Sequence, residues 1–116
     1  MTFVQWQNAV ANGMSIAEQK EGYYKLAIPE SGLIIWDTFT SAAKVDFKKP
    51  HNPLLFISGS IDNTIPAYLN YENYRKYKDV SSVTDYKEFE GGNHFVLGQS
   101  NWKEKAAYIL EWINRQ

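Results

Sequence analysis

The 116-residue sequence contains no cysteine, which excludes disulfide frameworks, thiolate metal sites and cysteine nucleophiles. Neither positive nor negative residues are in excess, and the formal net charge is -1. There is therefore no electrostatic reason to expect nucleic acid or a membrane surface as a partner. No apolar run approaches the length of a membrane span, and the first residues lack the basic and apolar regions of a secretory signal. We therefore expect a cytoplasmic protein.

Hydrophobic residues make up 44% of the chain and aromatic residues 16%, a composition typical of folded globular proteins. A domain of this length buries roughly two-thirds of its unfolded surface, which is enough for one core. The connector from Lys44 to Asn52 is the most plausible internal boundary, because Pro50 and Pro53 bracket the entry to the strand that follows. It separates a helical segment, 1–47, from a segment with strand patterns, 48–116.

The central stretch of the second segment runs from Pro53 to Pro66. Its residues Leu54 to Ile57 are apolar without alternation, which is typical of an interior strand of a mostly parallel sheet, covered on both faces. Gly59 ends the run, and Asp62 follows in the loop past the carboxyl end of the strand, where open α/β sheets hold their ligands. Pro66 suits the first turn of a helix. The pattern predicts a strand, an acidic loop and a helix.

The same reasoning predicts the remaining elements. Apolar spacing indicates helices, and Ser15-Ile16-Ala17-Glu18 and Asn101-Trp102-Lys103-Glu104 fit capping boxes. The predicted elements are helices within 3–11, 15–28 and 31–39, a helix at 67–78, a strand at 83–89 and a helix at 102–114. The two strands joined by a helix form a right-handed βαβ unit with parallel strands, so the fold class is α/β.

Two side chains of types that take part in catalysis follow the two predicted strands. Because neighbouring parallel strands end at the same edge of a sheet, about 4.8 Å apart, Asp62 and His94 are expected at one rim. A carboxylate and an imidazole together form the orienting half of a nucleophilic triad. Either residue alone is better explained as a turn aspartate or a solvated loop histidine. Their positions after consecutive strands favour the functional interpretation.

At these residues the chain resembles the α/β-hydrolases. Gly59-Ser60-Ile61-Asp62-Asn63-Thr64-Ile65-Pro66 is similar to the G-x-x-D-x-x-x-P segment after their penultimate strand, and Phe89-Glu90-Gly91-Gly92-Asn93-His94-Phe95 is similar to their last strand and histidine loop. The resemblance implies that Asp62 is the acid and His94 the base of a Ser-Asp-His triad. It also implies the C-terminal portion of that fold, with 1–47 as the helical cap segment and 102–114 as the terminal helix.

The nucleophile that this resemblance requires is missing. A nucleophile elbow needs an apolar strand followed by G-x-S-x-G, and the nearest match, Gly13-Met14-Ser15-Ile16-Ala17, ends in alanine and follows no apolar strand. The capping box accounts for Ser15. We therefore expect the serine of an ester or acyl hydrolase to lie outside these residues, and the chain to be inactive alone. Tyr23, Tyr24, Trp36 and Phe39 of the cap segment would line an apolar pocket, although core packing explains them equally well.

No cofactor is implied, and His51 and His94 lack the spacing of a zinc site. Two other classes of function remain. A non-catalytic chain would fold by self-association or by pairing with a complementary chain at the open edge of strand 53–59. A phosphoacceptor receiver domain would explain Asp62 and Pro66, but it needs acidic strands before residue 53, where the pattern predicts helices.

Overall fold

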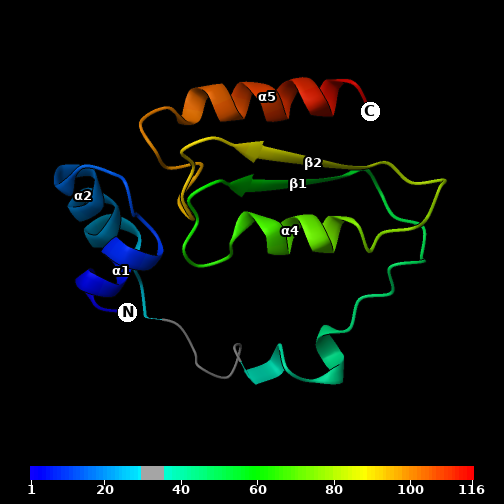
Figure 1. The fold of residues 1–116 in the computed structure, drawn as a ribbon, viewed down its shortest axis with the longest axis horizontal. Helices are drawn as coiled ribbons and strands as arrows, with labels where there is room; N and C mark the ends of the chain where they lie inside the picture. The colour runs from blue at the N-terminus through cyan, green and yellow to red at the C-terminus, as the bar shows by residue number, and fades with distance from the viewer. Residues whose placement is uncertain (30–35) are drawn as a thin grey trace.

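The computed structural model describes residues 1–29 and 36–116, and its centre is a two-stranded parallel sheet. Strand β1 (Leu54–Gly59) pairs with β2 (Thr84–Phe89) in a register that places Leu54 opposite Thr84 and Gly59 opposite Phe89. Helix α4 (Ala67–Tyr74) connects the strands, and α5 (Trp102–Asn114) follows β2 (Figure 1). The predicted α/β class with two parallel strands joined by a helix is confirmed.

The two helices cover opposite faces of the sheet. The ring of Tyr86 lies 5.3 Å from that of Tyr71, on α4, whereas the ring of Phe89 lies 5.7 Å from that of Tyr108, on α5. Successive side chains of a strand point to opposite faces, so positions 86 and 89 of β2 face different layers. The sheet is therefore the middle layer between α4 and α5.

Strand β1 is less enclosed than its sequence predicts. Leu54 to Ile57 are half-buried, and β2 is the only strand paired with β1 within residues 1–29 and 36–116. Within the described residues β1 is therefore an edge strand, and an interior position would require a further strand that these residues do not supply. An apolar strand edge without a partner is a site where further strands pair.

Helices α1 (Phe3–Ala9) and α2 (Ile16–Leu26) lie at the carboxyl ends of the two strands (Figure 1). They bury Trp6, Val10 and Ala11 between them, and the ring of Phe95, from the loop after β2, lies 5.6 Å from that of Trp6. The capping box predicted at Ser15 is present, with the Glu18 carboxylate accepting from the amide of Ser15 at 3.0 Å. This helical layer thus shares its core with a loop of the sheet.

Several local predictions differ from the structure. Helix α4 begins at Ala67, as predicted, with Pro66 as its N-cap, but it ends at Tyr74 rather than Lys78. Helix α5 has the predicted bounds, but Asn101 forms no capping box and instead accepts from the ammonium of the buried Lys105. The helix predicted from residue 31 begins outside the described residues.

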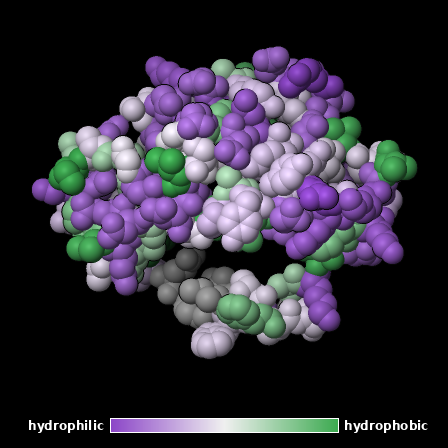
Figure 2. Space-filling view, in the orientation of Figure 1, coloured by the Kyte–Doolittle hydropathy of each residue, from purple (hydrophilic) through white to green (hydrophobic). Residues whose placement is uncertain are grey.

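None of the described helices has the length and apolar character needed to cross a membrane. The face of the molecule in Figure 2 is mostly hydrophilic, with scattered hydrophobic residues.

The two strands end in a contact that only glycine permits. A Cβ added to Gly59 would lie 2.2 Å from the carbonyl oxygen of Gly92, and one added to Gly92 would lie 2.8 Å from the Cα of Gly59. Backbone pairing continues past the strands, since the amide of Ile61 donates to the carbonyl of Gly92 at 2.9 Å. The loops that follow β1 and β2 are therefore held directly against each other.

Candidate active site

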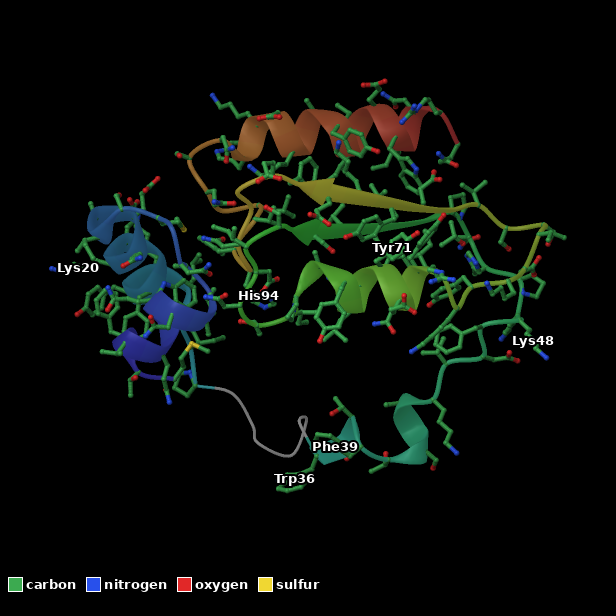
Figure 3. The ribbon with its side chains drawn as sticks, in the orientation of Figure 1. Lys20, Trp36, Phe39, Lys48, Tyr71 and His94 are labelled. Atoms are coloured by element: carbon green, nitrogen blue, oxygen red, sulfur yellow. The ribbon has the colours of Figure 1, made fainter. Side chains whose placement is uncertain are left out.

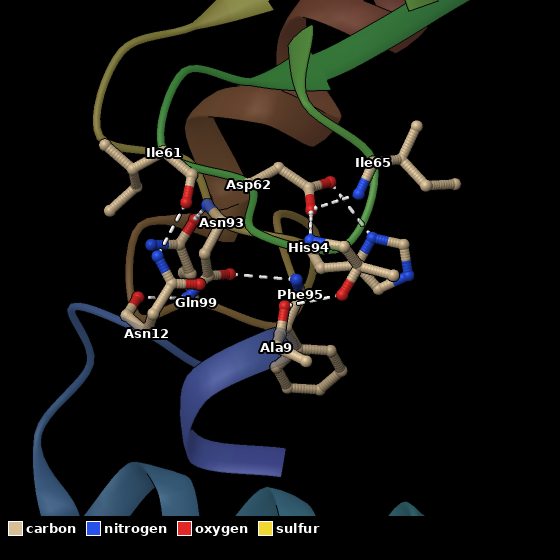
Figure 4. Close-up of polar contacts among 10 residues, drawn as sticks. Ala9, Asn12, Ile61, Asp62, Ile65, Asn93, His94, Phe95 and Gln99 are labelled. Atoms are coloured by element: carbon tan, nitrogen blue, oxygen red, sulfur yellow. Dashed lines mark hydrogen bonds and ion pairs between the residues drawn. The ribbon is translucent and has the colours of Figure 1, made fainter. Parts of the chain in front are cut away.

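Asp62 and His94 meet at the rim formed by these two loops. The Oδ2 atom of Asp62 lies 2.9 Å from Nδ1 of His94, although the residues are 32 positions apart in the chain (Figure 4). The side chain of Asp62 is 7% exposed and that of His94 is 35% exposed. The structure thus brings together the two residues that the sequence singled out.

The Asp62 carboxylate is fixed by hydrogen bonds at both oxygens. Its Oδ1 atom accepts from the amides of Thr64 at 2.8 Å and Ile65 at 2.9 Å, so the loop closes on its own side chain before α4 begins. Its Oδ2 atom is left for His94. Because an ionised carboxylate only accepts hydrogen bonds, Nδ1 of the neutral imidazole is the donor and Nε2 carries the lone pair.

The Nε2 atom of His94 has no hydrogen-bond partner in the part of the chain that the structure describes. With its side chain about one-third exposed, the imidazole keeps this nitrogen available to a group from outside. An imidazole oriented at Nδ1 by a carboxylate and open at Nε2 is able to take a proton from a hydroxyl group.

The carboxyl end of helix α1 closes the rim from the other side. The last carbonyl groups of a helix have no partner within it, and here three consecutive ones accept from the two loops. The pairs are Asn63 Nδ2 with Asn8 O at 2.9 Å, Thr64 Oγ1 with Ala9 O at 2.6 Å, and Phe95 N with Val10 O at 3.1 Å. Helix α1 and the loops that carry Asp62 and His94 therefore satisfy each other's polar groups.

Asn93 is a positioning residue that the sequence analysis missed. Its side chain is fully buried; Nδ2 donates to the carbonyl of Asn12 at 2.8 Å, and Oδ1 accepts from the amide of Phe95 at 2.8 Å (Figure 4). These bonds fix the backbone around His94 and tie it to the α1–α2 connection. The available signal was an asparagine, which both donates and accepts, directly before the histidine.

Ser15 has a structural role at the start of α2. Its hydroxyl donates to the Glu18 carboxylate at 2.7 Å. Hydrogen bonds from the hydroxyl and then the amide of Ser15 lower the pKa of Glu18 below its usual value. Among the described residues the Ser15 hydroxyl makes no contact with His94, and the capping interpretation of this serine holds.

The other candidate residues are not part of the site. Trp36 and Phe39 are 71% and 79% exposed and lie well away from His94 in Figure 3. Tyr23 and Tyr24 pack against the ring of Phe3, at 5.4 Å and 6.4 Å between centroids. Packing therefore explains Tyr23, which lies against the buried core of the helical layer, whereas Tyr24 is 78% exposed.

His51 lies at the other end of the sheet. Its Nε2 atom is 3.2 Å from the hydroxyl of Thr84, the first residue of β2. Within the described residues, no three side chains of the types that bind metal ions gather into one cluster.

Comparisons of this chain with protein-family models, with curated proteins and with solved structures found no match. The functional conclusion therefore depends on the geometry around Asp62 and His94.

We expect Asn93→Ala to lower the free energy of unfolding by about 2 kcal/mol, because a fully buried side chain is removed and the partly buried carbonyl of Asn12 loses its partner. The matched control is Asn63→Ala, which removes one bond from an exposed side chain and should cost below about 1 kcal/mol. Urea denaturation of both variants measures the difference. Equal losses would show that Asn93 does not hold the histidine loop.

Proposed function

We propose that Asp62 and His94 are the acid and the base of a Ser-Asp-His hydrolase acting on an ester or a related acyl compound. In this proposal 48–116 is the C-terminal part of an α/β-hydrolase core and 1–47 its helical cap segment. The supporting observation is the 2.9 Å contact between Asp62 and His94. The two residues follow successive parallel strands in the order acid then histidine, which is the order of that family.

In this proposal each of the two side chains has a separate step. Asp62 holds the Nδ1 proton of His94, so Nε2 removes the proton from a serine hydroxyl as its oxygen bonds to the acyl carbon. The imidazolium then gives this proton to the leaving alcohol as the ester bond breaks. Water repeats the sequence and releases the acid from the acyl-serine. No cofactor is needed for these proton transfers.

In the proposal the serine comes from a segment outside these 116 residues that pairs with β1. The outer edge of β1 has no strand partner within the described residues, and its apolar residues are half-buried. A further parallel strand at this edge would end at the same rim as Asp62, about 4.8 Å from β1. A nucleophile elbow at the end of such strands would complete the site.

A second candidate is a non-catalytic chain that folds by self-association or by pairing with a complementary chain. The same open edge favours it, because Leu54 to Ile57 contain no charge or proline that would prevent edge-to-edge pairing. This second candidate function gives no role to the contact between Asp62 and His94.

An activated ester, p-nitrophenyl acetate, tests whether the chain holds its own nucleophile. We expect no saturable hydrolysis by the chain alone, and the same slow linear rate for His94→Ala and for the histidine control His51→Ala. Saturable turnover lost in His94→Ala but kept in Ser15→Ala would contradict the missing serine. Turnover lost in Ser15→Ala would make Ser15 the nucleophile.

The orientation of His94 is tested by ¹⁵N NMR of its imidazole at a pH where it is neutral. We expect the proton on Nδ1 in the unsubstituted chain, because the Asp62 carboxylate accepts it. Asp62→Asn should remove this preference, since the amide also donates. Asp79→Asn, which alters a carboxylate that accepts from Ser81, is the matched control and should leave the tautomer unchanged. A proton on Nε2 in the unsubstituted chain would rule out the proposed base.

Sedimentation velocity at micromolar concentration distinguishes the second candidate. Self-association through β1 predicts a dimer whose fraction rises with concentration and falls in Ile57→Lys, because a charge on an edge strand opposes pairing. Ile113→Lys, on the exposed side of α5, is the control and should leave the dimer unchanged. A compact monomer at all concentrations would count against self-association.

A further inference from the structure

A groove of about 430 Å³ begins at His94. Its walls come from the end of α2 and from the loop after β2, and we call it the His94 groove; its residues are Leu26, His94, Phe95, Val96, Leu97 and Gly98. The volume lies in the range of small-molecule sites, about 300–1,000 Å³. Figure 3 places His94 where the helical layer of α1 and α2 meets the strand ends.

The chemistry of the His94 groove is apolar apart from the histidine. Leu26 and Leu97 are 55% and 51% exposed, so two large aliphatic side chains remain in contact with solvent there. Among the described residues of the lining, His94 is the only titratable side chain. A charged group in this groove would give up water without gaining an ionic partner, whereas an alkyl group gains by leaving water.

Charged residues begin in the adjoining cavity. This second cavity, about 340 Å³, shares Leu26, Phe95 and Gly98 with the His94 groove and adds Glu18, Glu21 and Lys25 among its lining residues. An alkyl chain that starts at His94 therefore meets an apolar surface first and charged side chains farther along. This arrangement limits the length of chain that the His94 groove favours.

We propose that the His94 groove binds the uncharged alkyl part of a short acyl substrate, with the carbonyl carbon at the His94 end. This assignment rests on the proposed function, because the base defines which end of the substrate reacts. It specifies the substrate class as neutral esters of short aliphatic acids. Acids with a charged far end are disfavoured, because the described lining residues include no Lys, Arg, Asp or Glu to pair with them.

Binding of uncharged acyl amides tests the groove without requiring the serine. Hexanamide, acetamide and 6-aminohexanamide are titrated into the chain while the methyl groups of Leu26 and Leu97 and the ring of His94 are followed by ¹H–¹³C NMR. We expect saturable shifts at all three residues with hexanamide. Acetamide should bind at least about tenfold more weakly, because it lacks the methylene groups that the groove would bury. The aminated amide should also bind more weakly than hexanamide.

Leu97→Gln should weaken hexanamide binding by about fivefold, corresponding to roughly 1 kcal/mol of lost apolar contact. The matched control is Leu110→Gln, which changes a leucine of similar exposure, 59%, on α5 outside the groove and should have no effect. Both leucines are more than half exposed, so neither substitution removes a core residue.

The outcomes separate the two proposals. If hexanamide causes no saturable shift, if the three amides bind equally, or if Leu97→Gln binds as tightly as Leu110→Gln, the groove assignment is overturned while the NMR result for the His94 tautomer stands. If the amides bind as expected but the His94 proton lies on Nε2, the groove remains a ligand site and the proposed catalytic role is overturned.

Discussion

The parallel pairing of β1 with β2, closed by the contact between Gly59 and Gly92, is the constraint on which the candidate site depends. With no room for a Cβ at either glycine, the backbones approach closely at the strand ends. The amides of Ser60 and Ile61 then bond to the carbonyls of Phe89 and Gly92, so the two loops leave the sheet together. A carboxylate and an imidazole that are distant in sequence thereby come within one hydrogen bond of each other.

The helical layer of α1 and α2 is hydrogen-bonded directly to the loops that carry Asp62 and His94. A helix end and two irregular loops each carry backbone groups without regular partners, and leaving such groups unpaired is costly. At this rim the carbonyls of α1 accept from the loop side chains and from the amide of Phe95. Moving α1 away would break these bonds together, so the position of the helical layer and the geometry of Asp62 and His94 are coupled.

Local signals and simple topology rules predicted much of this from the sequence. The capping box at Ser15 and the bounds of α5 depend on neighbouring residues, and the meeting of Asp62 with His94 follows from two parallel strands ending at one edge. Features set by distant contacts that no topology rule anticipates were not predicted. The described residues pair β1 on one edge only, and the bond that ties Asn93 to the α1–α2 connection reaches Asn12, which is 81 positions away.

Two groups without partners among the described residues, the outer edge of β1 and Nε2 of His94, bear on the choice between the two candidate functions. A chain that merely associates through β1 would account for the open strand edge, but not for a nearly buried aspartate whose two oxygens are divided between backbone amides and an imidazole. Such an arrangement orients His94 and leaves Nε2 without a partner among the described residues. A neighbouring strand that ends in a serine loop would satisfy both the edge and this nitrogen. In the hydrolase proposal one further strand with its loop would account for both the unpaired edge of β1 and the open nitrogen, whereas the associating chain would account for the edge alone.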